Sequence, residues 1–168
     1  MKSPWLLRLA TLVLLLLLQA CAGYGGGGLR PGASADEVRS VMGEPAAIYA
    51  DPAGGWVWAY PRGPVGLHTF MVSFDASGAL ARVEQVLDDR GFARLRAGAD
   101  READVLRLFG PPWQVTAFER SKERVLSWRF RDAWGSPAQF HVVLDQAGLV
   151  LRWMQVPEDT RSNRWDVP

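Results

Sequence analysis

The chain has 168 residues, 48% of them hydrophobic, and its 19 basic side chains nearly balance 18 acidic ones. This composition, which includes eight tryptophans, is typical of a folded protein and argues against disorder. Because there is no strong basic excess, nucleic acid is not expected as a partner. Cys21 is the single cysteine, which excludes a disulfide within the chain.

Residues 1–20 are organised like a secretory signal peptide. Lys2 and Arg8 give a positive start, and the aliphatic run over residues 9–18 is shorter than the roughly 20 residues that span a membrane. Leu18-Gln19-Ala20-Cys21 then resembles a bacterial lipobox. The resemblance implies diacylglycerol transfer to the Cys21 thiol, cleavage between Ala20 and Cys21, and acylation of the new N-terminus. The alternative is an ordinary signal peptide with an incidental cysteine.

Two features after the cleavage position bear on where the protein is held. Residue 22 is Ala rather than Asp, which resembles lipoproteins sorted to the outer membrane. Residues 21–28 are rich in glycine, so we expect a flexible tether. A phosphate-binding loop is disfavoured, because this segment follows no strand and lacks the Lys-Ser/Thr pair of that motif.

Residues 29–88 are expected to form a first helix-and-sheet unit. Ser34 and Glu37 have the spacing of a capping box, and Gly43 and Pro45 end the helix predicted over residues 35–42. Alternating apolar residues then predict three or four antiparallel strands. The strands are expected over residues 48–50, 56–60, 70–74 and 80–87, with a tight turn at residues 75–78.

Residues 95–156 repeat this pattern, and residues 157–168 are expected to be a flexible tail. Asp100 is the expected N-cap of a second helix, which Gly110 and the two prolines after it end. At one constant offset, Trp58 matches Trp128 and Tyr60 matches Phe130. The same offset matches Phe70, Val72, Phe74, Asp75 and Gly78 with Phe140, Val142, Leu144, Asp145 and Gly148. The predicted fold is therefore α+β, with two tandem units that could share one continuous sheet.

The opening helix and aromatic strand of the first unit resemble those of a known family. Gly32, the capped helix through Val38, the Met42-Gly43-x-Pro45 ending and the Trp58-x-Tyr60 strand resemble the SmpA/OmlA (BamE-like) outer-membrane lipoprotein domain. That resemblance implies a small α+β fold and a role beside the β-barrel assembly machinery. Two such units in tandem also resemble the architecture of the β-lactamase inhibitor protein, in which duplicated halves form one concave sheet.

Residues with catalytic or metal-binding potential are few. His68 and His141 do not match at the repeat offset, and no zinc spacing or Gly-x-Ser-x-Gly elbow is present. Asp75 and Asp145 sit at matching turns, where a carboxylate accepts backbone N–H groups. We therefore expect no cofactor, no metal and no catalytic residue, and a protein that is not an enzyme.

Aromatic residues on the predicted strands are the candidate partner-binding surface. The six candidates are Trp56, Trp58, Tyr60, Trp128, Phe130 and Trp134. They either pack beneath the helices or form an exposed surface that grips a protein, since tryptophan and tyrosine are enriched in binding hot spots.

The expected function combines anchor and surface. We expect a lipid-anchored lipoprotein on the periplasmic face of the outer membrane, binding a protein partner in outer-membrane protein assembly or envelope maintenance. The alternative is an inhibitor-like binder that presents a concave sheet to an envelope or secreted hydrolase.

Overall fold

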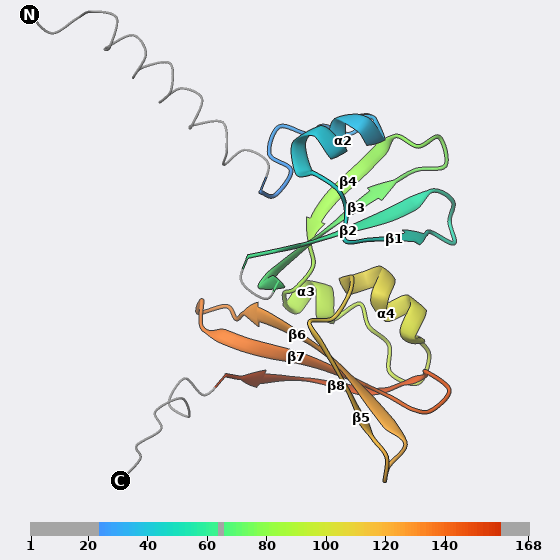
Figure 1. Ribbon diagram of the computed structural model, residues 1–168, viewed down its shortest axis with the longest axis vertical. Coiled ribbons are helices and arrows are strands. Elements are labelled where there is room, and N and C mark those ends of the chain that lie inside the picture. The colour runs from blue at the N-terminus through green and yellow to red at the C-terminus, as the bar shows by residue number, and fades with distance from the viewer. Residues whose placement is uncertain (1–23, 64–65, 159–168) are drawn as a thin grey trace, which may run out of the picture.

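The computed structural model describes residues 24–63 and 66–158. It confirms the predicted α+β class: two four-stranded antiparallel sheets, each preceded by short helices (Figure 1). The first unit contains α2 (Ala35–Met42), β1 (Ala47–Ala50), β2 (Trp56–Arg62), β3 (His68–Phe74) and β4 (Leu80–Gln85). The second contains α3 (Asp89–Phe92), α4 (Glu102–Phe109), β5 (Gln114–Phe118), β6 (Glu123–Arg131), β7 (Pro137–Leu144) and β8 (Val150–Pro157). Strand order follows the sequence in both sheets, here called sheet 1 and sheet 2.

Helix α2 begins and ends as its sequence predicts. Ser34 Oγ accepts a hydrogen bond from Glu37 N at 3.2 Å, and Glu37 Oε2 accepts one from Ser34 N at 2.8 Å. These reciprocal bonds satisfy two amide groups that the first helical turn leaves free. At the other end Gly43 has φ 78° and ψ −166°, a backbone region that is essentially restricted to glycine.

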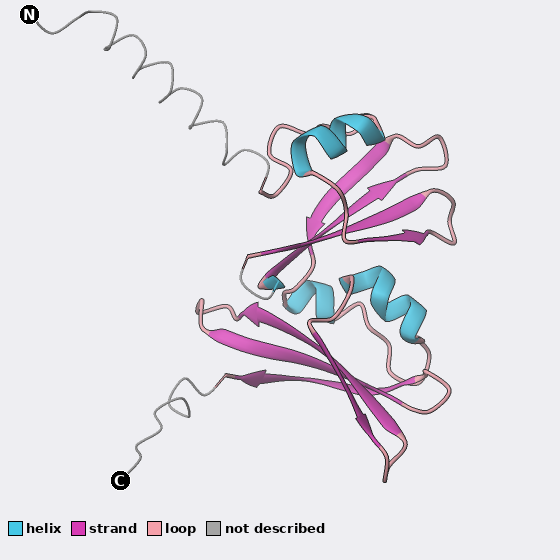
Figure 2. Ribbon diagram, in the orientation of Figure 1, coloured by secondary structure: helices cyan, strands magenta, loops and turns pink. Residues whose placement is uncertain are grey.

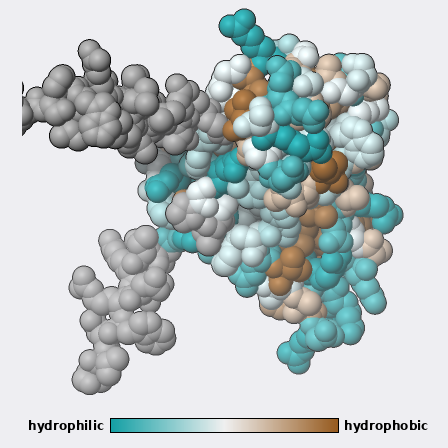
Figure 3. Space-filling model, turned by 45° about the horizontal axis from the view of Figure 1, so that its top comes forward, coloured by the Kyte–Doolittle hydropathy of each residue, from teal (hydrophilic) through white to brown (hydrophobic). Residues whose placement is uncertain are grey.

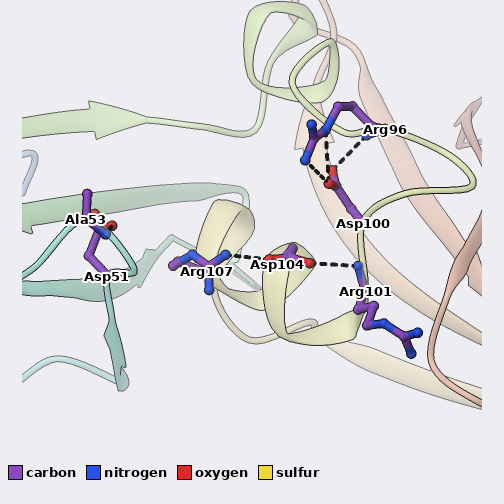
Figure 4. Close-up of polar contacts among 7 residues, drawn as sticks. All are labelled: Asp51, Ala53, Arg96, Asp100, Arg101, Asp104 and Arg107. Carbon is purple, nitrogen blue, oxygen red and sulfur yellow. Dashed lines mark hydrogen bonds and ion pairs between the residues drawn. The ribbon is translucent and has the colours of Figure 1, made fainter.

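Helix α4 starts one residue later than predicted. Its N-cap is Arg101, and Asp104 Oδ2 accepts a hydrogen bond from Arg101 N at 2.8 Å. Asp100 instead closes the preceding turn, where its buried carboxylate accepts hydrogen bonds from Arg96 N and the Arg96 guanidinium (Figure 4). The carboxylate that caps the start of α4 is therefore that of Asp104, in the first turn of the helix, and not that of Asp100.

The elements stack in four layers: α2, sheet 1, the pair α3 and α4, then sheet 2 (Figure 2). The two units do not share one continuous sheet, because helices α3 and α4 lie between the two sheets. Val57, Ala59 and Met71 of sheet 1 join Phe109 and Trp128 of the second unit in one buried cluster. A second cluster lies between α2 and the other face of sheet 1. The two units therefore share a core.

Matching hydrogen bonds support the duplication. Gly32 N donates to Leu80 O at 2.7 Å, and Gly98 N donates to Val150 O at 2.7 Å. The last strand pair of each sheet also carries a register shift at the same place, Ser73/Phe74 in sheet 1 and Val143/Leu144 in sheet 2.

The register corrects the predicted aromatic match. Trp58 lies opposite Val72, whereas Trp128 lies opposite Phe140. Tyr60 is the residue opposite Phe70, the counterpart of Phe140, so Trp128 is equivalent to Tyr60 and not to Trp58. A shift of two residues keeps a side chain on the same face of a strand. The predicted alternation was therefore unaffected by the error.

The glycine-rich segment, which is expected to be a tether, contacts the first unit in the part that the structure describes. The Tyr24 ring packs edge-on against Phe70 with centroids 6.0 Å apart, and its hydroxyl lies 3.0 Å from His68 Nδ1. Gly26 is buried, and a side chain there would meet Met42 Sδ at 3.2 Å. Residues 24–26 thus lie against the first unit, and glycine allows the backbone to approach it closely.

Candidate partner-binding surface

The lipidation and cleavage residues predicted from the sequence, Cys21 and Ala20, lie outside the described residues. Among those described, no helix is long and apolar enough to cross a membrane.

Trp58 and Tyr60 belong to the core beneath α2. They are 5% and 1% exposed, and the ring centroids of Trp58 and Phe74 are 4.5 Å apart. The Tyr60 hydroxyl donates a 3.1 Å hydrogen bond to Gly43 O at the end of the helix. These two residues fix α2 on sheet 1, so they do not contribute to a binding surface of the folded protein.

Trp128 and Phe130 belong to the core beneath α3 and α4. Both are almost fully buried, and they pack around Phe92, Phe109 and Phe140. Their side chains share a face of sheet 2 that the two helices cover. Of the two interpretations of the aromatic strands, packing beneath the helices holds for these residues as well.

Trp56 and Trp134 are the two exposed members of the predicted set, 53% and 91% exposed. Trp56 starts β2 after the β1–β2 turn, and Trp134 lies in the β6–β7 turn. These two turns lie on opposite sides of the molecule in Figure 1. The six candidates therefore do not form one surface.

The structure instead presents one uncovered sheet face. Helices α3 and α4 cover one side of sheet 2, and no described helix or strand covers the other (Figure 1). Strand alternation and register define this open face. Its side chains are Gln114, Thr116, Phe118, Glu123, Val125, Ser127, Arg129, Gln139, His141, Val143, Arg152, Met154 and Val156.

The open face mixes polar and apolar side chains on both its middle and its outer strands. Ser127 Oγ and His141 Nδ1 are hydrogen-bonded at 2.9 Å in the middle strands. Phe118, Met154 and Val156 on the outer strands are 39–49% exposed. Exposed apolar side chains on both outer strands leave apolar area that a protein partner could cover.

Ion pairs at both ends of the open face neutralise its charge. Arg152 binds Glu123 at 2.9 Å, and Arg129 binds Glu158 just beyond the end of β8. Hydrogen bonds from these arginines lower the pKa of Glu123 and of Glu158. Both carboxylates thus stay ionised and paired at neutral pH. The surface between them carries no unpaired charge that would select a strongly acidic or basic partner.

The edge of sheet 2 formed by β5 adjoins the open face. Residues 112–118 contain no charged side chain, and Trp113, Val115 and Phe118 are all more than 40% exposed. Exposed sheet edges usually carry charges that discourage pairing with another strand. Strand β5 was not predicted from the sequence, although its equivalence to β1 in the first unit could have located it.

The histidines and turn aspartates have local partners. His68 contacts Tyr24, as described above. Asp75 Oδ1 accepts hydrogen bonds from Ser77 N at 2.9 Å and Ala79 N at 3.1 Å. Asp145 Oδ1 accepts one from Leu149 N at 2.8 Å. Within the described ranges, no group of three or more His, Cys, Asp and Glu residues is arranged to hold a metal ion.

Protonation of His141 is expected to destabilise the fold. Burial lowers the pKa of His141, so the folded protein favours the neutral ring. The unfolded chain binds this proton below about pH 6.5, so stability falls as the pH drops through that value toward the folded pKa. His141→Gln should therefore lose less stability than the unsubstituted protein between about pH 7.5 and pH 5. Urea denaturation at both pH values measures this, and equal losses would contradict it.

No family model, no curated protein and no solved structure matches this chain at a significant level, so its fold and its surface provide the basis for a functional proposal.

Proposed function

We propose that this chain is a lipid-anchored lipoprotein, held on the periplasmic face of a bacterial outer membrane, that binds another protein through the open face of sheet 2. The likeness of its first helix and aromatic strand to the SmpA/OmlA domain favours a role in outer-membrane protein assembly or envelope maintenance. The anchor is supported by the sequence alone, through Leu18-Gln19-Ala20-Cys21. The binding surface is supported by the geometry of the second unit.

The observation that carries the binding proposal is an asymmetry between two equivalent units. Sheet 1 is covered by α2 on one face and by α4 on the other, whereas sheet 2 is covered on one face only. The register makes Val57, Ala59 and Met71, which pack on the second unit, equivalent to Val125, Ser127 and His141 of the open face. The equivalent face of sheet 1 therefore already serves as a docking surface within the chain.

The differences between the two equivalent faces indicate the kind of contact. Ala59 and Met71 are buried permanently inside the chain, and a hydrogen-bonded Ser127–His141 pair occupies their positions on the open face. The Ser127 hydroxyl and the His141 ring nitrogen are hydrogen-bonded to each other. The pair is therefore stable both when the face is in contact with water and when a partner covers it. We therefore expect a separable partner that presents a helical surface, as α4 does to sheet 1.

Substitutions of exposed apolar residues on the two outer strands test the surface. Phe118→Glu combined with Met154→Glu places two unpaired charges in the proposed interface, and should reduce partner crosslinking in intact cells at least tenfold. The matched control is Val41→Glu, which adds a charge to an exposed apolar position on α2. If the double variant still crosslinks to the same partner at the same yield, the open face is not the binding surface.

Cys21→Ser tests the anchor separately. Acyl chains on Cys21 would hold the protein stably at a membrane, since two or more chains give lasting attachment. The variant should move from the membrane fraction to the soluble fraction, with its fold unchanged by circular dichroism. Retention in the membrane fraction would contradict lipidation at this residue.

The identity of the crosslinked partner separates the two functional hypotheses. Components of the barrel-assembly machinery would support the first, and a soluble envelope hydrolase would support the inhibitor-like alternative. The inhibitor-like alternative would also have to bind its hydrolase through the open face of sheet 2. The two separate sheets do not form the shared concave sheet that the inhibitor architecture would require.

A further inference from the structure

The docked glycine-rich segment limits how far the folded protein can lie from its anchor. Tyr24, Gly25 and Gly26 pack on sheet 1, which leaves only Cys21, Ala22 and Gly23 as a connection. Fully extended, three residues span about 10 Å. A lipid-modified Cys21 would therefore hold Tyr24 at the membrane surface.

The contacts of Tyr24 identify which end of the molecule this is. Its hydroxyl is hydrogen-bonded to His68 Nδ1 at 3.0 Å. The same oxygen would lie 3.1 Å from a β-carbon added at Gly63. Gly63 lies in the β2–β3 turn, and His68 is the first residue of β3. Figure 1 shows the β6–β7 turn on the same side of the molecule, with the β5–β6 turn on the opposite side.

The β6–β7 turn carries the most exposed large apolar residue among those described, Trp134. The turn is well ordered by hydrogen bonds: Asp132 Oδ1 accepts from Trp134 N at 2.9 Å and from Ser136 N at 2.8 Å, and Arg131 donates to Gly135 O at 2.7 Å. Holding an indole ring outward on a fixed turn exposes apolar area to water at a cost, unless another surface covers it.

We propose that this end is a membrane-facing surface, on which Tyr24 and Trp134 lie in the headgroup layer of the bilayer that holds Cys21. The inference rests on the lipid anchor of the proposed function. Tryptophan and tyrosine are enriched at membrane interfaces because their rings are apolar and carry one polar group. Lipid is the favoured occupant because the anchor ends here and the connection is too short to lift this end away.

Charge around the β6–β7 turn indicates a headgroup contact that does not depend on anionic lipid. Arg90 and Arg131 lie at the same surface depression as Asp88, Asp89 and Asp132, which gives no positive excess. The contact should therefore occur on zwitterionic lipid and respond weakly to salt. The β5–β6 hairpin then projects away from the membrane, which leaves β5 and the open face accessible to a partner (Figure 1).

Single introduced cysteines can measure this orientation, because Cys21 is the only native cysteine and lipidation occupies its thiol. Ala133→Cys labels the proposed membrane-facing turn, and Ser121→Cys labels the far β5–β6 turn. The lipidated proteins are reconstituted in phosphatidylcholine vesicles that contain nitroxide-labelled lipid, and each carries a thiol-attached fluorophore. Quenching should be at least threefold stronger at position 133 than at position 121.

Two variants and one control decide whether the aromatic ring makes the contact. Trp134→Ala should reduce quenching at position 133 at least twofold without changing stability, since the side chain is 91% exposed. Trp56→Ala is the matched control on the opposite side and should leave quenching unchanged. Equal quenching at positions 133 and 121 would overturn the inference while the anchor stands. Cys21→Ser protein that stays in the membrane fraction would instead contradict the anchor itself.

Figure 3 shows one face of the molecule, on which hydrophobic residues form small separate areas within polar surface. Scattered apolar side chains of this kind are ordinary on the surface of a folded protein and need no partner of their own.

Discussion

Phe92→Ala is expected to lower the free energy of unfolding by about 3–5 kcal/mol, the usual cost of removing a buried aromatic ring from a packed core. Phe92 is fully buried in the short helix α3, between the two units. Its ring stacks on Phe140 with centroids 3.9 Å apart and packs edge-on against Phe130 at 4.9 Å. The substitution would leave a cavity where the ring was. Few neighbouring side chains could move to fill it, because the surrounding rings of Phe109, Phe130 and Phe140 are held by α4 and sheet 2.

Phe118→Ala is the matched control for Phe92→Ala. The same side chain is removed from an exposed position on β5, so the free energy of unfolding should change by about 0.5 kcal/mol or less. Urea denaturation followed by circular dichroism measures both variants. Similar losses at the two positions would mean that α3 does not form part of the shared core.

Gly110→Ala is expected to destabilise the protein more than Gly43→Ala, by about 1–3 kcal/mol. The two glycines end equivalent helices with nearly the same backbone, φ 72° and ψ −169° at Gly110 and φ 78° and ψ −166° at Gly43. Both substitutions therefore carry a similar backbone strain, of the order of 1–3 kcal/mol. Only the surroundings differ between the two sites.

The surroundings of Gly110 are the contact between the two units. A β-carbon there would lie 3.0 Å from Ala59 Cβ and 3.3 Å from Thr69 Cγ2, whereas nothing lies within 4 Å of one at Gly43. The difference between the two unfolding free energies thus measures how tightly sheet 1 packs on the end of α4. Equal destabilisation would mean that sheet 1 can shift slightly away from the end of α4 without cost, and would contradict tight packing at this contact.

Local chemistry explains why the helices were predictable. The Ser34–Glu37 capping box and the glycine after each helix act within a few residues, so their effects are legible in the chain itself. Helix α3 was not predicted. Its four residues are too few to show a helical period, and Phe92 rather than helix propensity holds it in place.

The candidate site was less predictable, because alternation along a strand gives two faces without saying what covers each one. Trp58 and Trp128 were correctly grouped with their strand neighbours, but their burial depends on where α2 and α4 dock. Trp134 was singled out as an aromatic residue near a strand. Only its position in a turn, on the side where Tyr24 is docked, gave it a proposed partner.

The sequence by itself determined the α+β class, the duplication, the start of α2 and the C-terminal ends of both main helices, because repeated capping and strand patterns are local signals. It also carries the whole case for lipidation at Cys21. The tertiary structure alone decided that the units stack with helices between two separate sheets, that residues 24–26 are docked, and that one face of sheet 2 stays uncovered. These features depend on contacts between residues far apart in the chain, such as Gly110 with Ala59, which no local pattern encodes.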